Sequence, residues 1–173
     1  MLAGLFTHHS GSRRGRNTVE IKLALTVVER NALVPFSPAQ MYALVADVES
    51  YARFLPWCQR ATVHEQDEEH MKASLVVAKG PLRKSFTTIN HLTPNEGIDI
   101  ELVEGPFRRL NGQWRFEELG DAGCKVSFNL RFEFTSRLLS ATLGPLFNEI
   151  AGTMVHAFAR RANDVYKRSD KTS

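Results

Sequence analysis

The sequence contains little cysteine, with only Cys58 and Cys124 in 173 residues, and the two lie far apart in the chain. Neither belongs to a CxxC pair or to a cysteine/histidine spacing, so a disulfide framework and a zinc site are both poorly supported. A chain of this length buries roughly 70% of its unfolded surface as one domain and does not need such cross-links. We therefore expect a single domain, no metal and a reducing compartment.

Long apolar runs are also missing, because no stretch approaches the roughly 18 consecutive apolar residues that span a membrane; we expect a soluble protein. An excess of one charge is nearly absent. The formal net charge is +3, and residues 1–24 account for all of it, with four basic side chains against one acidic. The remaining residues carry 18 basic and 18 acidic side chains. The pI near 9.0 is therefore not a nucleic-acid signature, and no DNA partner is expected.

Residues 1–24 have the composition of a disordered tail, since they are basic, contain Gly and Ser, and lack a sustained hydrophobic period. Two interpretations are open. The segment is either an upstream extension, including an over-assigned start codon, or a mitochondrial presequence, and its short apolar face and its histidines favour the first. We predict that residues 25–168 form the folded domain and that residues 169–173 form a short C-terminal tail.

Motifs of the common catalytic sites are absent, because the chain has no GxSxG, Walker or GxGxxG segment. The stretch 64–70, rich in histidine and acidic residues, lacks the HExxH spacing and falls where a β-turn is expected. We interpret it as a polar hairpin tip. His91 and His156 have no Ser, Cys or carboxylate at motif spacing, and the glutamate pairs 101/104 and 117/118 fall on a solvent face or in turns. We expect no catalytic residues and a protein that is not an enzyme.

Strict alternation is the clearest pattern that is present. In residues 125–134 every even position is apolar and every odd position is polar, which predicts a strand with one dry and one wet face. From Gly144 to Lys167 apolar residues recur at threes and fours, which predicts a long amphipathic helix. That helix must bury its apolar stripe against the dry face of the sheet.

The rest of the chain predicts two short helices and six further strands. Residues 25–34 form a first strand, and Ser37, Pro38 and Gln40 form a capping box that starts a helix. A second short helical turn at 51–55 ends at Pro56. Strands follow at 59–66, 71–78, 82–92, 98–103 and 107–118, before the one at 125–134. Because the connectors are short, we expect an α+β fold built on an antiparallel meander.

Four segments resemble one known family: residues 28–58, 80–86, 105–114 and 147–162. The first and third contain the specific motifs Tyr-x-x-Phe-Leu-Pro-Trp-Cys and Pro-Phe-x-x-Leu-x-Gly-x-Trp. The chain is similar over about residues 25–167 to the START-like (polyketide cyclase/dehydrase, SRPBCC) proteins of the coenzyme Q-binding and RatA toxin group. The resemblance implies a helix-grip fold, in which a curved antiparallel seven-stranded sheet holds the long C-terminal helix over a cavity. It also implies one of two roles, which are binding ubiquinone in support of respiration, or binding the large ribosomal subunit and blocking its association with the small one.

A ligand site between the sheet and the long helix would need an apolar slot with one or two hydrogen-bond donors. We expect its mouth at Tyr51, Arg53, Trp57 and Asn111, with residues 54–56 as a gate or, alternatively, as a plug. The same large side chains could simply fill the space as core. The predicted lining residues are Tyr51, Phe54, Leu55, Trp57, Val76, Phe86, Trp114, Phe128, Phe132, Phe147, Ile150, Met154 and Phe158. The expected ligand is an isoprenoid quinone, above all ubiquinone, and no cofactor is required.

Cations beside two Gly-Pro turns form a second candidate site. We call it the basic rim, and it consists of Lys79, Arg83, Lys84, Arg108 and Arg109. If the two hairpins are neighbours, these five side chains would allow salt-dependent binding of ribosomal RNA or, transiently, of anionic lipid at a membrane surface. An ordinary solvated surface is the alternative, because the folded part is electrically neutral.

Two functional hypotheses follow from the sequence. The preferred one is a non-enzymatic protein that holds ubiquinone for respiratory electron transport. The alternative is a RatA-like toxin of a type II toxin-antitoxin pair that acts on the large ribosomal subunit. The resemblance to bacterial members indicates a bacterial cytoplasm, and the basic tail keeps the mitochondrial matrix or the inner-membrane face as the other possible location.

Overall fold

The computed structural model describes residues 25–169, and the segments 1–24 and 170–173, with the predictions made for them, lie outside that range. One sheet is built from β1 (Thr26–Val34), β2 (Cys58–Gln66), β3 (His70–Lys79), β4 (Leu82–Thr93), β5 (Gly97–Glu104), β6 (Phe107–Glu118) and β7 (Cys124–Phe134). The helices are α1 (Pro38–Ala46), α2 (Tyr51–Phe54) and α3 (Arg137–Ser169), with single 3-10 turns η1 (Val48–Ser50) and η2 (Gly120–Ala122).

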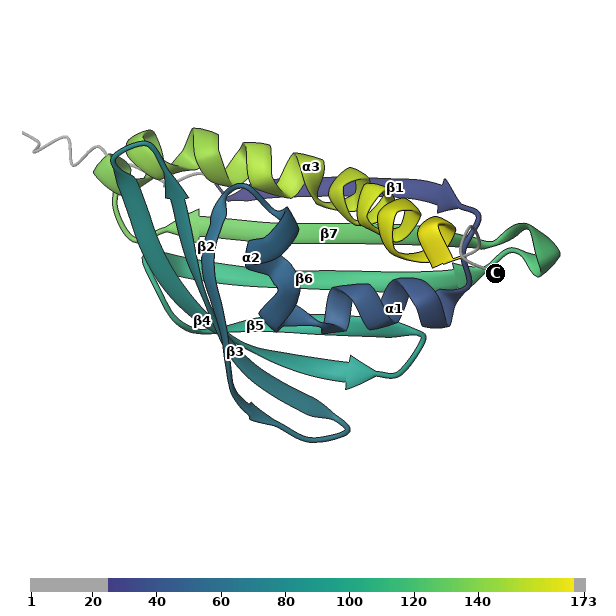
Figure 1. The fold of residues 1–173 in the computed structure, drawn as a ribbon. Helices are drawn as coiled ribbons and strands as arrows, with labels where there is room; N and C mark the ends of the chain where they lie inside the picture. The colour runs from purple at the N-terminus through teal and green to yellow at the C-terminus, as the bar shows by residue number, and fades with distance from the viewer. Residues whose placement is uncertain (1–24, 170–173) are drawn as a thin grey trace, which may run out of the picture.

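The sheet is an antiparallel meander with one displaced strand. Its order is β1-β7-β6-β5-β4-β3-β2, so every strand from β2 to β7 pairs with its neighbour in sequence, as the short connectors predicted. β1 pairs with β7 from Thr26 opposite Phe132 to Val34 opposite Cys124. The predicted helix-grip fold is confirmed, with α3 lying across the sheet (Figure 1).

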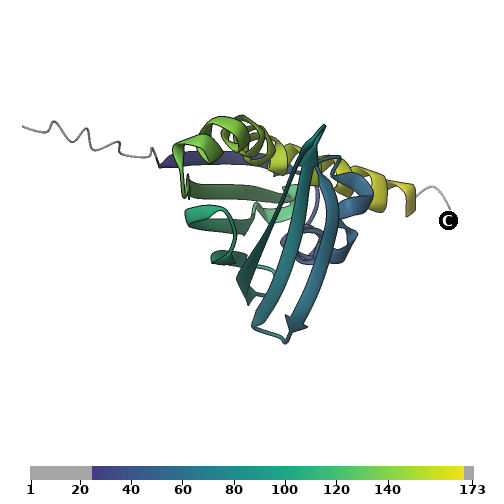
Figure 2. The same ribbon diagram turned by 90° about the vertical axis from the view of Figure 1, so that its left-hand side faces the viewer.

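The alternation of β7 decides which face of the sheet is dry. Its even-numbered residues from Val126 to Phe134 are all buried, whereas its odd-numbered residues point to the other face. We call the dry face the inner face and the other the outer face. The sheet curves around the inner face, and the helices lie on that side of it (Figure 2).

The loop after β1 folds back because a strong helix start follows it. Ser37 Oγ accepts a hydrogen bond from the backbone N–H of Gln40 at 3.1 Å, and Gln40 Oε1 accepts one from the N–H of Ser37 at 2.9 Å. The predicted capping box is therefore confirmed. Helix α1 places Met41 and Val45 in the core. The short α2 follows it and leads into β2.

Helix α3 begins at Arg137, two turns before the predicted start at Gly144. Pro145 lies inside the helix, one residue after the start that the apolar period predicted. The real start is capped by Ser136, whose Oγ accepts a hydrogen bond from the N–H of Leu139 at 3.1 Å. Leu143 is buried, so packing holds the early turns where Pro145 removes one backbone hydrogen bond.

Helix α3 packs on β1, β7 and α1 and closes one half of the sheet. Phe158 lies at the centre of this contact with no exposed surface, and its ring centroid is 5.3 Å from that of Tyr51 and 5.4 Å from that of Trp114. Ala151 and Ala162 are also fully covered, which lets the helix approach the core closely. Further along the sheet, β3, β4 and β5 have few contacts with α3, and a cavity remains beneath the helix.

Candidate functional site

An inner cavity of about 90 Å³ lies between the sheet and α3. The sheet contributes inner-face side chains of β3 to β7, and α3 contributes Phe147, Ile150, Ala151 and Met154. Apart from the polar atoms of Tyr51, Trp57 and Trp114, the lining is apolar except at two positions, Thr88 and Asn90. These two share the inner face of β4 with Phe86 and Leu92, so polar residues at two positions of an apolar alternation were the signal in the sequence that our prediction missed.

Eight predicted lining residues meet around this cavity: Tyr51, Trp57, Phe86, Trp114, Phe128, Phe147, Ile150 and Met154. Their roles in binding stay predictions. Tyr51 is held by its hydroxyl, which donates a hydrogen bond to the carbonyl of Val45 at 2.5 Å. Burial, with smaller contributions from Cys58 and Asp47, raises the pKa of Tyr51 well above its ordinary value, so the phenol stays neutral.

Three predicted lining residues do not reach either space beneath α3. Val76 lies on the outer face, because Leu75 and Val77 line the cavity and successive side chains of a strand point to opposite faces. Phe132 packs among other phenylalanine rings, including Phe147 at 6.1 Å. Phe158 fills the contact between α3 and the sheet. For the last two positions the alternative of plain core packing holds.

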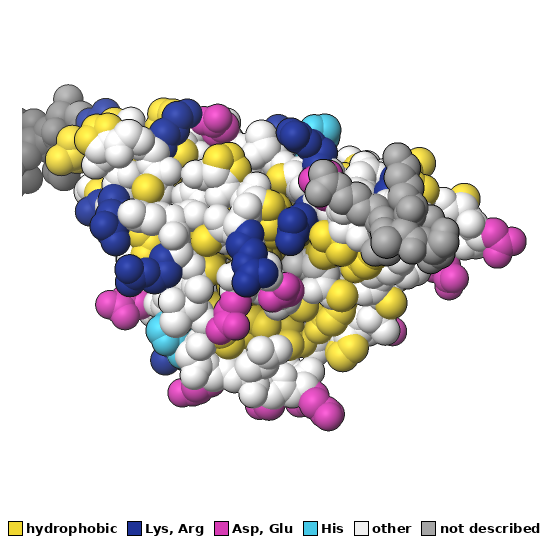
Figure 3. Space-filling view, in the orientation of Figure 1, with side chains coloured by type: hydrophobic (Ala, Val, Ile, Leu, Met, Phe, Trp, Pro, Cys, Tyr) yellow, Lys and Arg dark blue, Asp and Glu magenta, His cyan; other side chains and the backbone are white. Residues whose placement is uncertain are grey.

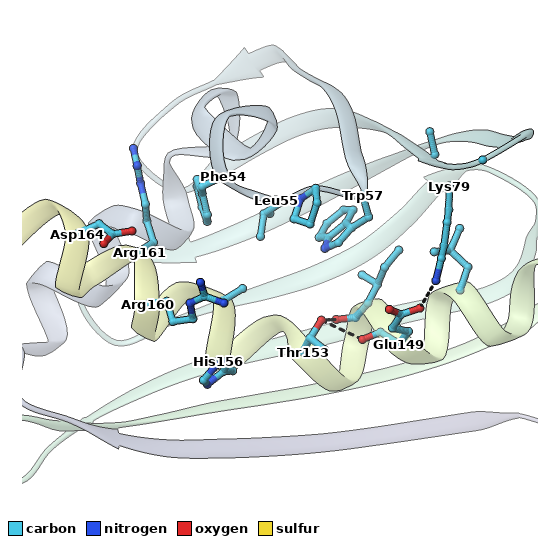
Figure 4. Close-up of a pocket in the computed structure, with 16 residues that line it drawn as sticks. Phe54, Leu55, Trp57, Lys79, Glu149, Thr153, His156, Arg160, Arg161 and Asp164 are labelled. Atoms are coloured by element: carbon cyan, nitrogen blue, oxygen red, sulfur yellow. Dashed lines mark hydrogen bonds and ion pairs between the residues drawn. The ribbon is translucent and has the colours of Figure 1, made fainter.

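A second, larger space is a half-open groove of about 880 Å³ between α3 and the loop that joins α2 to β2 (Figure 4). Phe54, Leu55, Pro56 and Trp57 form the wall on the loop side. The predicted gate loop therefore lines the groove, whereas Leu55 is almost fully buried and also plugs the end of the core. The wall on the helix side is mixed in polarity and consists of Leu146, Glu149, Ile150, Thr153, His156, Ala157, Arg160, Arg161 and Asp164.

Charged side chains mark the two ends of the groove. At one end Lys79 Nζ lies 2.7 Å from Glu149 Oε2, which ties the end of β3 to α3. At the other end the Arg161 guanidinium lies over the Phe54 ring, 4.9 Å from its centroid. Both contacts are at least partly accessible to water, so each contributes little to stability. Between them the loop wall is apolar, whereas the helix wall carries Thr153, His156 and Arg160.

Two residues expected at the mouth lie elsewhere. Arg53 is exposed on α2 and lines neither space. Asn111 lies on the outer face of β6, because its neighbours Leu110 and Gly112 face inward. Their predicted placement at the mouth was wrong for the same reason. Each lies close to an aromatic motif in the sequence, but its side chain points away from the cavity that the aromatic residues line.

The two hairpins of the basic rim are neighbours at one end of the sheet. Thr87 of β4 pairs with Glu104 of β5, and the Phe86 and Phe107 ring centroids are 5.7 Å apart. The start of α3 joins them, because the backbone N–H of Thr135 donates a hydrogen bond to the carbonyl of Pro106 at 3.1 Å. That contact adds Arg137, an exposed cation that sequence reasoning did not place there.

The cations of the rim differ in their partners. Lys79 pairs with Glu149, and Arg108 Nη1 lies 3.8 Å from Glu133 Oε1. Arg83, Lys84 and Arg109 are exposed and have no carboxylate within 4.0 Å among residues 25–169. In Figure 3 basic side chains lie at this end and also across the middle of the face, beside acidic ones, and further acidic side chains follow the lower and right-hand edges. Basic charge on this neutral domain is therefore not confined to the rim.

The histidine-rich stretch 64–70 forms a hairpin tip between β2 and β3, as predicted. Asp67 Oδ1 accepts hydrogen bonds from the backbone N–H groups of Glu69 and His70, and these bonds lower the pKa of its carboxyl. Among residues 25–169 there is no group of three potential metal ligands. No helix in that range is both long enough and apolar enough to cross a membrane.

Comparison with known proteins gives consistent results. A family model described as polyketide cyclase / dehydrase and lipid transport matches residues 34–159. The ribosome association toxin RatA of Vibrio cholerae is 50% identical over 139 residues, which cover 80% of this chain and 96% of that protein. The mitochondrial coenzyme Q-binding protein COQ10 of Drosophila melanogaster is 33% identical over 148 residues, which cover 83% of this chain and 60% of that protein. The names of both relatives describe association or binding.

Among solved structures, the Zhui aromatase/cyclase from Streptomyces sp. R1128 superposes with a TM-score of 0.68 at 18% identity, over 81% of this chain and 94% of that one. At this identity the likeness concerns the fold alone. The fold therefore accommodates enzymes as well as binding proteins, and the function has to be argued from the site.

Proposed function

This chain belongs to the polyketide cyclase/dehydrase and lipid transport family, and we propose that it associates with the ribosome through the basic rim, as a binding protein and not as an enzyme. The observation that carries the proposal is the 50% identity to a ribosome association toxin over 96% of that toxin's length. Sequence reasoning alone preferred the quinone. The high identity to RatA and the small inner cavity reverse that order.

The charge distribution supports a polyanionic partner. Residues beyond the tail are neutral in sum, so attraction to RNA must come from a local surface. The rim supplies Arg83, Lys84 and Arg109 without carboxylate partners among the described residues, at an end formed by three adjoining segments. Each phosphate contact changes the logarithm of the binding constant by roughly 0.7 to 0.9 per tenfold change in salt. We propose the large ribosomal subunit as the partner and the bacterial cytoplasm as the location.

Sedimentation with purified ribosomal subunits tests the proposal. We expect the protein to sediment with the large subunit at low salt and to dissociate as salt rises. The double variant Arg83→Glu/Arg109→Glu should weaken association by at least about tenfold, because it turns two phosphate contacts into repulsions. Both side chains are exposed, so its unfolding curve should match that of the parent.

A matched control reverses two exposed cations away from the rim, Arg53 on α2 and Lys167 near the end of α3, in the variant Arg53→Glu/Lys167→Glu. Neither residue has a carboxylate within 4.0 Å in the described range, and the change in net charge is the same. Association should be nearly unchanged. Equal losses in both variants would mean that net charge, and not the rim, attracts the ribosome, while binding that survives in both would refute the rim as the contact.

A second function is favoured by a different observation, the groove with its apolar loop wall and the inner cavity beside it. The groove of about 880 Å³ lies within the range of roughly 300–1,000 Å³ that small-molecule sites occupy, and a coenzyme Q-binding protein is among the relatives. We propose that the chain also holds a hydrophobic ligand there, with ubiquinone as the first candidate. Lys79 belongs to both the rim and the groove, but Arg83, Lys84 and Arg109 do not line the groove, so the two functions are compatible.

Mass spectrometry of an organic extract tests this second function. The protein is purified from a quinone-producing host and extracted beside an equal amount of protein that was denatured and washed beforehand. We expect about one ubiquinone or related lipid per chain in the native sample alone. An extract with no lipid above the washed control would refute the carrier function and leave ribosome association standing.

A further inference from the structure

Two polar side chains interrupt the apolar lining of the inner cavity. Thr88 and Asn90 occupy consecutive inner-face positions of β4, and each is only 8% exposed. The Thr88 hydroxyl donates a hydrogen bond to Asn90 Oδ1 at 3.0 Å. A buried amide is unfavourable unless its remaining N–H groups also find acceptors. The pair therefore marks a place where an acceptor is needed.

The unused donor is the amide nitrogen of Asn90. Within residues 25–169 no group accepts a hydrogen bond from it, and His91 Nε2 is the one fully covered side-chain nitrogen or oxygen in that range without a hydrogen-bond partner. The Asn90 nitrogen must therefore border open space, and the space that Asn90 lines is the inner cavity. A carboxamide nitrogen carries two N–H groups, so the cavity contains a donor that faces an otherwise apolar interior.

The lining residues also determine which kind of hydrogen-bond acceptor can bind in the inner cavity. No ionisable side chain other than the neutral phenol of Tyr51 lines the inner cavity in the described part of the chain. A carboxylate or phosphate would lose its hydration there without meeting an opposite charge. The cavity therefore favours a neutral acceptor, such as a carbonyl oxygen, attached to apolar atoms.

The inner cavity is too small to act alone. Its volume of about 90 Å³ corresponds to about three water molecules, and a known cavity that binds benzene has about 150 Å³. Trp57 and Ile150 line both the cavity and the groove, so they separate the two spaces. The Trp57 side chain is partly exposed and makes no hydrogen bond to residues 25–169, so it can turn without breaking one.

We propose that the groove and the inner cavity form one site, in which Asn90 binds the carbonyl oxygen of a neutral lipid whose apolar body lies in the groove. Trp57 is the movable partition. Thr88 is a positioning residue, because its bond to Oδ1 turns the N–H groups of the amide towards the cavity. The inference rests on the second function proposed above, and it adds a ligand class: neutral carbonyl lipids, with fatty acids and lipid phosphates excluded from the inner end.

A matched pair of small probes tests the inference. Duroquinone is tetramethylbenzoquinone, and durene is the same ring without its carbonyl groups. Trp57 and Trp114, the two tryptophans of the chain, both line the inner cavity, and Trp57 also lines the groove, so quenching of their fluorescence by duroquinone reports binding in the site that the two spaces form. Durene affinity is measured by its competition with duroquinone. We expect the wild-type chain to bind duroquinone about tenfold more tightly than durene, since a neutral hydrogen bond contributes about this factor.

The variant Asn90→Leu removes the donor and keeps an apolar side chain of similar size. It should bind duroquinone about tenfold more weakly than the wild type and bind durene equally well or better. The matched control is Asn163→Leu, on an exposed position of α3 that lines neither space. It should bind both probes like the wild type. Circular dichroism checks that each variant is folded.

Equal affinity of the wild type for duroquinone and durene would overturn the inference, whether or not Asn90→Leu folds. The same holds if a folded Asn90→Leu binds duroquinone as tightly as the wild type. The lipid extraction separates these failures from that of the carrier function. A lipid in the extract without preference for duroquinone refutes only the role of Asn90, whereas an empty extract with no binding of either probe refutes both.

Discussion

The two halves of the sheet differ in how closely α3 packs on them. In the half formed by β1, β7 and β6, α3 lies directly on the strands, and Trp114, Val126 and Phe132 are almost completely buried. In the half formed by β3, β4 and β5, the inner-face residues Leu75 and Phe86 stay partly exposed to the space beneath the helix. We call these the packed half and the open half. One continuous sheet thus combines a core that fixes the helix with a site that keeps room for a ligand.

This division has a physical cause. A helix is straight, whereas the sheet curves, so a helix seated on one half must separate from the other (Figure 2). Seating depends on small residues of α3, since Ala151 and Ala162 are fully covered. The space that remains needs no special sequence. It follows from the curvature, and the residues around it decide only what it can hold.

Removing a large side chain from the packed half should give the largest effect on stability. Phe158→Ala deletes a ring with no exposed surface that touches Tyr51, Phe54 and Trp114. We expect a loss of about 3–5 kcal/mol in the free energy of unfolding, because the cavity cannot collapse between a helix and a sheet. Urea denaturation followed by circular dichroism measures it.

The matched change in the open half is Phe86→Ala. Its ring borders the inner cavity and is already partly exposed, so its deletion should reduce the free energy of unfolding clearly less than Phe158→Ala does. Equal losses at the two positions would show that the halves are packed alike and would remove the basis of the comparison.

Enlarging a buried side chain should stabilise the open half and destabilise the packed half, with smaller effects than the deletions. Ala73→Val points two more carbon atoms into the inner cavity and should raise the free energy of unfolding by about 1 kcal/mol. Ala162→Val, at a fully covered position of α3, should lower it by about 1–3 kcal/mol through overpacking. Thermal and urea unfolding of the two variants measure the difference. Destabilisation by both would mean that the cavity near Ala73 has no room for two carbons.

The elements of the packed half could be predicted from the sequence more fully than those of the open half. The alternation in β7 assigned each side chain to a face, because a period of two leaves no other choice. In β3 the residues 75–78 are all apolar, so the sequence does not show which of them face the core, and Val76 was predicted on the wrong face. The predicted start of α3 was seven residues late, because the apolar period was followed only from Gly144 and the cap at Ser136 was not recognised.

The site itself depends on contacts between distant segments, which local patterns do not encode. The groove exists because residues 54–57 face α3, about a hundred residues later in the chain. Lys79 was expected to be free for phosphate but pairs with Glu149, and Arg137 joins the rim through the contact of Thr135 with Pro106. The sequence therefore identified most residues of the groove and the rim. Which charged side chains pair, and how large the groove and the cavity are, could be seen only in the structure.

The outer face between β5 and β6, where the two halves meet, gives the smallest expected effect, and it depends on pH. Burial alone would raise the pKa of Asp99, but hydrogen bonds from Gln113 and Arg115 and the charges of Arg115 and His91 lower it below the ordinary 3.8. Arg115 Nη2 lies 2.9 Å from Asp99 Oδ1. A depressed pKa stabilises the fold fully above 3.8, and this contribution is lost as the pH falls through the lower folded value.

Asp99→Asn removes this titration and keeps the shape of the side chain. Near pH 7 the variant should be less stable by under about 1 kcal/mol, because the pair with Arg115 is accessible to water. The gap should close as the pH falls below 3.8, and 0.5 M salt should shrink it. Urea unfolding from pH 7 to pH 3 measures it. A gap that stays constant with pH would mean that packing of the side chain, and not its charge, joins β5 to β6 on a face that α3 never touches.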